Sequence, residues 1–295
     1  MIYISTGGYK NSVASETVKL FYENGIKNIE LSGGLFSIDL KQDLFKYKES
    51  VSFQVHNYFP PPEEPFVFNL ASMNEDINKK SLNHAKKAIN WASELGGNAY
   101  SFHAGFLIDP KPRELGKKIN KRNLFNRESA IQIFINNVNE IADYAKSHSI
   151  AILIENNVLS HGNLIEFGND PLLMTTPEEC AHIMEQTNYN VNLLIDVAHL
   201  KVSANSLKYD PSSMFKTCDK WIAAYHLSDN NGLSDTNDSF NEESWFWKYV
   251  KKDCSYYSIE VYNKEISEII NLFEIAKDKL FSNWKISNTP KNIKD

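Results

Sequence analysis

The sequence predicts a closed barrel of eight parallel strands with helices outside it, a (β/α)8 architecture of the α/β class. Eight short runs rich in apolar, β-branched and aromatic residues recur along the 295 residues, and amphipathic segments lie between them. This alternation is typical of repeated βα units, whose strands pair in parallel. The runs are almost continuously apolar, as expected of strands covered on both faces. No linker interrupts the series, so we expect one domain over residues 1–295.

Each predicted element follows from its local pattern. The candidate strands are residues 2–6, 27–32, 51–56, 98–103, 150–155, 191–196, 221–227 and 256–261. Helices are expected between strands, for example over 75–95, 127–148 and 265–281. In the second of these, apolar residues recur at spacings of three and four, which places them on one helix face. Thr176 followed by Pro177 predicts another helix start, because threonine caps a first turn that tolerates proline.

Composition limits the classes of function. The net charge is −6 at pH 7 and arginine is scarce, whereas proteins that grip a phosphate backbone usually carry a basic stripe. Nucleic acid is therefore not an expected partner. Cys180, Cys218 and Cys254 follow no CxxC spacing, which argues against a disulfide framework or a thiolate zinc site. No run approaches the roughly 18 apolar residues of a membrane span, and the N-terminus does not resemble a signal peptide. We expect a cytoplasmic protein that does not contact membranes.

Polar residues gather at the C-terminal ends of the predicted strands, which meet at one mouth in a parallel barrel. The third to eighth strands end on or near His56, His103, Glu155, Asp196, His226 and Glu260. Divalent cations of the manganese, magnesium or cobalt type prefer carboxylate oxygens with one or two imidazoles. Each residue taken alone could equally cap a helix or form a buried hydrogen bond. The last four together favour a metal site, because a shared cation would offset the desolvation of buried acids.

These residues, in this order, resemble the xylose isomerase-like barrels. That family includes ketose 3-epimerases, hydroxypyruvate isomerase, inosose dehydratase and endonuclease IV. The resemblance spans almost the whole chain, and it is carried by residues 29–34, 56, 103–105, 153–157, 196–199, 226–230 and 259–260. The acidic and histidine positions are separated by about one βα unit each, which makes the series more specific than any one motif.

The resemblance implies roles for individual residues. The implied metal ligands are Glu155, Asp196, His226 and Glu260, with Mn²⁺ favoured over Mg²⁺, Co²⁺ and Zn²⁺. Glu155 and Glu260 are also implied as the acid/base pair of a sugar or sugar-phosphate isomerase or epimerase. The implied substrate-binding residues are His56, His103, His199, Asn157 and Asp229. Alternatively, His199 could have a supporting role, in which it hydrogen-bonds a carboxylate that binds the metal. The implied partner is a small carbohydrate, and relatives are often homodimers or homotetramers.

Three alternatives stay open at this point. A dehydratase of the inosose or dehydroshikimate type would use the same metal and base. A phosphodiesterase of the endonuclease IV type would use His56 and His103, but Asn237 stands where that branch has a histidine, and an amide is a poor zinc ligand. The ketose 3-epimerases carry an arginine where Gly232 stands here. The third alternative is a barrel that binds a sugar or a metal without catalysis.

Overall fold

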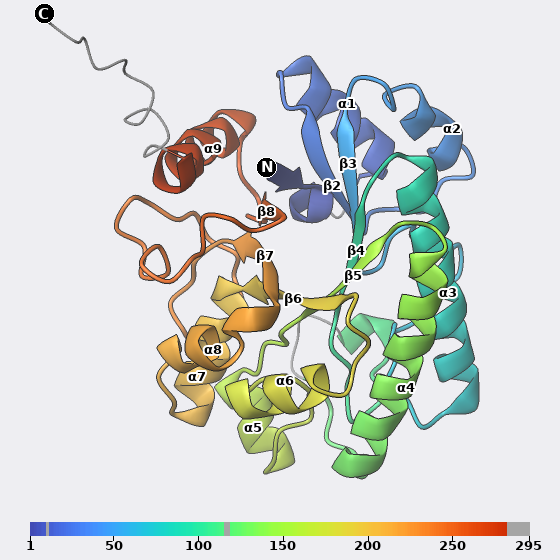
Figure 1. Ribbon diagram of the computed structural model, residues 1–295, viewed down its shortest axis with the longest axis vertical. Helices are drawn as coiled ribbons and strands as arrows, with labels where there is room; N and C mark the ends of the chain where they lie inside the picture. Colours follow the sequence, from blue (N-terminus) through green and yellow to red (C-terminus); the bar gives the residue numbers. More distant parts are fainter. Residues whose placement is uncertain (10–11, 115–118, 282–295) are drawn as a thin grey trace, which may run out of the picture.

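Eight strands close into a parallel barrel in which each strand pairs with its neighbours in chain order and β8 returns to β1 (Figure 1). The computed structural model describes residues 1–9, 12–114 and 119–281. The strands are β1 (Ile2–Ser5), β2 (Asn28–Ser32), β3 (Ser52–His56), β4 (Ala99–His103), β5 (Ala151–Glu155), β6 (Val191–Asp196), β7 (Ile222–Leu227) and β8 (Tyr256–Ile259). The predicted fold class and all eight predicted strand positions are confirmed.

The helices surround the strands (Figure 1). They are α1 (Ala14–Glu23), α2 (Leu40–Phe45), α3 (Glu75–Glu94), α4 (Arg127–Lys146), α5 (His161–Phe167), α6 (Pro177–Met184), α7 (Val197–Leu207), α8 (Ser212–Thr217) and α9 (Ile266–Phe281). Short 3-10 turns occupy Thr6–Tyr9, Pro112–Glu114 and Asp219–Trp221. The seventh unit differs from the others, because residues 228–255 form turns and bridges in place of a helix. Within the described ranges, no helix combines the length and the apolar character needed to cross a bilayer.

Polar side chains fix where several helices begin. The side chain of Thr176 accepts a hydrogen bond from the backbone of Glu179, as the sequence predicts, and Asn74 and Asn126 cap α3 and α4 in the same way. Asp196 caps α7 by accepting from the backbone N–H of His199. Each such cap satisfies a backbone donor that the helix itself leaves unpaired. At Asp196 the cap also holds a candidate ligand at the end of its strand.

Strand register brings the candidate site residues to one level of the barrel. His103 pairs with Glu155, and Asp196 pairs with His226. Glu260 follows β8 directly, and its backbone N–H donates to the carbonyl of Leu227 at 3.2 Å. Because side chains alternate along a strand, residues two and four positions earlier share the interior face. Below the site residues lie an apolar cluster of Tyr3, Ala99, Leu153, Leu194, Ala224 and Tyr256 and the buried serines Ser101 and Ser258. The site residues therefore lie above a layer that is mainly apolar.

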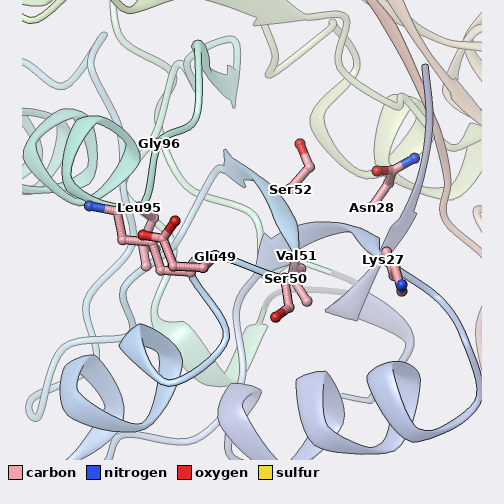
Figure 2. A pocket seen from close by; sticks show the side chains of 9 residues that line it. Lys27, Asn28, Glu49, Ser50, Val51, Ser52, Leu95 and Gly96 are labelled. Atoms are coloured by element: carbon pink, nitrogen blue, oxygen red, sulfur yellow. The ribbon is translucent and has the colours of Figure 1, made fainter.

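A depression at the opposite end of the barrel is not the candidate site. It is lined by residues at the starts of β2 and β3 and in the loops before them, among them Lys27, Glu49 and Ser52 (Figure 2). The lining side chains do not point toward a common centre (Figure 2). This is the N-terminal face, where residues of such barrels usually serve stability rather than catalysis.

Candidate metal centre

Four buried residues from four different strands meet at the C-terminal mouth. One possible ligand atom from each of His56, Glu155, His226 and Glu260 lies within 4.8 Å of the other three. Nδ1 of His226 lies 2.9 Å from Oε2 of Glu260 and 3.5 Å from Oε1 of Glu155. Oδ2 of Asp196 lies 3.9 Å from the same nitrogen. Three of the four residues that the sequence nominates as ligands, Glu155, His226 and Glu260, therefore belong to this group, and the fourth, Asp196, lies beside His226 but outside the group.

Several of these atoms are buried without a hydrogen bond. They are both carboxylate oxygens of Glu155, Oδ2 of Asp196 and Nδ1 of His226. Buried polar atoms in native proteins nearly always have a partner, and unpaired acids away from water are costly. A single cation bound between them would satisfy all of these atoms at once. The residues present therefore fit a divalent cation, and the donor set is rich in oxygen with one imidazole.

The electrostatics of the cluster reflect crowding of acids away from solvent. Burial raises the pKa of Glu155 to about 7 and also raises the pKa of Asp196. Burial opposes the charge of Glu260 as well, but His226 outweighs it and holds the pKa of that carboxyl below its ordinary value. For His226, burial opposes a second proton, yet the nearby acids, Glu30 foremost, raise its pKa well above the ordinary value. Binding of a cation would therefore release protons.

Glu30 on β2 orients His226, a role that the sequence did not assign. Its Oε2 lies 3.1 Å from Nε2 of His226, and its Oε1 accepts a hydrogen bond of 2.8 Å from Ser258. All three side chains are fully buried. Because a carboxylate only accepts, Nε2 of His226 carries a hydrogen, and Nδ1 is left to face the cluster. This carboxylate–histidine arrangement is the usual support of a metal-binding imidazole.

The Glu30→Gln variant should lower the affinity for Mn²⁺ by about 10- to 100-fold, the usual effect of losing such a support. The amide is a weaker acceptor than the carboxylate, so His226 loses its orientation. Calorimetric titration of the metal-free chain with Mn²⁺ measures the change. The matched control is Glu23→Gln, which alters an exposed glutamate on α1 that pairs with Lys19. An unchanged affinity in folded Glu30→Gln protein would remove Glu30 from this role.

His199 lies beside the ligand carboxylates. Its backbone N–H donates to Oδ1 of Asp196 at 2.7 Å, and its ring Nδ1 lies 3.0 Å from the carbonyl oxygen of Asn156 and 3.2 Å from Oε1 of Glu155. A carbonyl only accepts, so Nδ1 is a donor and has no lone pair for a cation. Nε2 faces Asp235 at 3.3 Å. Burial opposes protonation, but the neighbouring acids, with Asp196 first, raise the pKa of His199 well above its ordinary value. In the metal-free chain these acids therefore favour the protonated form of His199, in which both ring nitrogens donate.

Two further histidines flank the other oxygen of Glu155. Nε2 of His56 lies 3.4 Å from Oε2, and Nδ1 of His103 lies 3.3 Å from the same oxygen. His103, Glu155 and His199 form a second group whose possible ligand atoms lie within 4.8 Å of one another. In that group Nδ1 of His199, the nitrogen nearest Glu155, is the donor to the Asn156 carbonyl. The carboxylates around Nδ1 of His226 therefore suit a cation better than this second group.

Asn157 and Asp229 use their side chains to hold loops. Asn157 is buried, and its Nδ2 donates to the carbonyl oxygens of Ala104 at 2.8 Å and Leu173 at 2.9 Å. Asp229 accepts from Nζ of Lys201 at 2.7 Å and from the hydroxyl of Ser244 at 3.1 Å. Among the described residues, Asp229 belongs to neither of the two groups that could hold a cation. Their predicted contact with substrate stays a prediction.

Comparison with known proteins gives the family. The model of the xylose isomerase-like TIM barrel family matches residues 17–278. The chain belongs to the xylose isomerase-like TIM barrel family. A relative in Methanocaldococcus jannaschii, the uncharacterized protein MJ1311, is 25% identical over 217 residues, which are 72% of this chain. The match covers 66% of that relative, just under two thirds of its length.

Two solved structures illustrate the shared fold. A D-tagatose 3-epimerase-like protein superimposes with a TM-score of 0.72 at 20% identity, over 97% of this chain and 99% of the other. The IOLI protein with a bound zinc atom superimposes with a TM-score of 0.65 at 15% identity, over 95% of this chain and 97% of the other. At these identities the likeness shows the fold alone, because proteins that share a fold can catalyse different reactions.

Proposed function

We propose that this chain is a divalent-metal-dependent isomerase or epimerase of a sugar or sugar phosphate, which moves a proton at a carbon next to a carbonyl group. One observation carries the proposal. Two buried glutamates, Glu155 and Glu260, lie within 3.5 Å and 2.9 Å of Nδ1 of His226, at a centre whose orphaned atoms fit a cation. The likeness to a D-tagatose 3-epimerase-like protein supports this choice among the activities of the family.

Proton transfer next to a carbonyl is slow because the carbon is a weak acid. A bound cation would supply positive charge for the oxygen on which negative charge develops. We propose Mn²⁺, because three carboxylates and one imidazole form a mainly hard donor set; Mg²⁺, Co²⁺ and Zn²⁺ would use the same positions. Glu155, Asp196, His226 and Glu260 would hold the cation.

The two glutamates are suited to opposite halves of the transfer. In the metal-free chain the pKa of Glu155 is raised to about 7, whereas that of Glu260 is lowered, so Glu155 takes up a proton more readily than Glu260. Such a divergence between paired carboxyls favours Glu155 as the acid and Glu260 as the base. We therefore propose Glu260 as the base that removes the proton and Glu155 as the acid that returns one. His199, a donor beside Glu155, would steady a substrate oxygen.

Hydrogen exchange tests the proposal. Metal-replete protein is incubated in heavy water with a panel of ketoses, inososes and sugar phosphates, and products are followed by NMR. We expect deuterium at the carbon next to the carbonyl, a rearranged sugar, and loss of both signals when the cation is chelated. An unsaturated ketone would instead indicate the dehydratase. If protein of verified metal content exchanges hydrogen on none of these compounds, the result would contradict the isomerase and favour a non-catalytic binding barrel. Cleavage of an abasic duplex would favour the nuclease.

A further inference from the structure

His56 is the member of the four-residue cluster that the proposed mechanism does not use. It ends β3, is buried, and lies against the ring of His226 with a centroid separation of 4.7 Å. Its two ring nitrogens face different surroundings. Nε2 faces Oε2 of Glu155 at 3.4 Å, and Nδ1 lies 3.0 Å from the hydroxyl of Ser101. Which nitrogen carries the hydrogen decides whether Nε2 can bind a cation.

Two hydroxyl groups below His56, those of Ser101 and Tyr256, determine which ring nitrogen of His56 carries the hydrogen. The hydroxyl of Tyr256 donates to Oγ of Ser101 at 3.1 Å, and Ser101 in turn contacts Nδ1 of His56. The three side chains lie inside the barrel and are at most 1% exposed. Because Ser101 accepts from Tyr256, its own hydrogen points away from Tyr256, and Nδ1 of His56 at 3.0 Å is the acceptor within reach. The opposite arrangement would leave a buried hydroxyl hydrogen unpaired, which native proteins avoid.

We propose that Tyr256 and Ser101 hold His56 in the tautomer with its hydrogen on Nε2, so that the centre binds one cation and not two. A nitrogen that carries a hydrogen has no lone pair to coordinate a metal. A second cation beside Oε2 of Glu155 would need Nε2 of His56 together with His103 as ligands. That nitrogen cannot bind a cation, because the hydroxyl groups of Ser101 and Tyr256 keep a hydrogen on it. His56 then serves as a donor facing Glu155. The inference rests on the cation site of the proposed function, and it makes that site mononuclear.

The charge of the ring agrees with this arrangement. Burial, assisted by the charge of His226, lowers the pKa of His56 to about 3. The imidazole is therefore neutral at physiological pH and has a single N–H, whose place is set by its neighbours. Tyr256 and Ser101 are positioning residues, since they act only through His56.

Nitrogen NMR of the histidine rings reads the tautomer directly. The sample is the full chain with ¹⁵N-labelled histidine and one equivalent of Zn²⁺, and the signals of His56 are those lost in a His56→Gln variant. We expect a hydrogen on Nε2 and none on Nδ1. The reverse pattern would overturn the proposal. Once these signals are assigned, the native spectrum decides the tautomer even if a Tyr256 variant fails to fold.

Two matched phenol deletions test the role of Tyr256. Tyr256→Phe removes the donor that orients the hydroxyl of Ser101, so the Nδ1–H tautomer should become more populated. Tyr257→Phe is the control, because it removes a neighbouring buried phenol whose hydroxyl donates to the Lys251 carbonyl outside this chain of hydroxyls. It should leave the His56 signals unchanged. A Tyr256→Phe spectrum identical to the native one would remove Tyr256 from the proposal.

Zinc titration by calorimetry gives an independent readout. The native chain and Tyr257→Phe should bind one zinc ion tightly, and Tyr256→Phe should bind a second roughly tenfold more strongly than the native chain does, about the worth of one buried hydrogen bond. Two comparably tight zinc ions in the native chain would overturn the proposal. If the native chain binds no zinc, the metal centre of the proposed function would be contradicted. The NMR experiment would still report on the tautomer of His56.

Discussion

Glu155→Gln is expected to lower turnover by about 10²- to 10⁴-fold, the range associated with losing a general acid or base, and to weaken Mn²⁺ binding at the same time. Glu155 is fully buried, and its two oxygens face different partners: Oε1 faces His226 and His199, and Oε2 faces His56 and His103. Glutamine keeps the shape but removes the charge and the titrating proton. The readouts are the rate of deuterium uptake and the metal content of the purified variant.

A comparison of variants separates the two roles of the glutamates. Glu260→Gln should produce a similar loss of turnover, because the proposed base is then absent. Glu140→Gln is the matched control, since Glu140 is half exposed on α4 and pairs with Lys86. It should change neither turnover nor metal content. If Glu155→Gln and Glu260→Gln proteins, loaded with Mn²⁺, turned over an identified substrate at the native rate, neither glutamate would take part in the chemistry.

The fold could be predicted because barrel strands are buried on both faces. Their near-continuous apolar runs stand out from the helices, whose apolar residues recur at three and four. Helix starts at 75 and 127 were equally visible, since Asn74 and Asn126 cap them. The segment 228–255 departs from the alternation of strands and helices, because turns follow β7 in place of a helix. Aromatic packing within that segment, such as Phe246 on Phe240 and Trp247, replaces the expected amphipathic face.

The convergence of the nominated ligands followed from one topological rule, that the C-terminal ends of parallel strands meet at one mouth. Glu30, Ser101 and Tyr256 could not be found in that way, because they lie within strands and act inside the barrel. A signal for Glu30 existed, since a glutamate within an apolar strand needs a buried partner. Naming that partner as His226 requires the barrel to be closed, because the two residues are 196 positions apart in the sequence.

The contacts of the loop residues depend on conformation that residue order does not specify. Asn157 and Asp229 occupy positions that suggest contact with substrate, yet their side chains tie backbone and loops together. The approach of Asp235 to Nε2 of His199 depends on the path of the segment after β7. Sequence therefore predicted which strand ends carry polar groups, and the structure determined which groups face one another.

Cation affinity is expected to fall as the pH is lowered from about 8 to about 6. The acids around His226, Glu30 foremost, raise its pKa well above the ordinary value, so a proton on this imidazole competes with the cation. Below about pH 7 Glu155 holds a proton as well. Each displaced proton lowers the affinity by about tenfold per pH unit. A site with an ordinary histidine and ordinary carboxyls would change little between pH 8 and pH 7.

The same protons set how the stability of the metal-free chain depends on pH. Groups whose pKa is raised on folding stabilise the native state below their unfolded pKa, and that contribution is lost as the pH rises through the folded pKa. Glu155 and His226 both have this sign, so metal-free protein should become less stable as the pH rises from about 5 to about 8. Bound cation removes the repulsion and stabilises by mass action. Thermal unfolding with Mn²⁺ or with a chelator, across this range, should therefore show a difference in Tm that widens with pH; a constant difference would mean that these buried groups do not exchange protons for the cation.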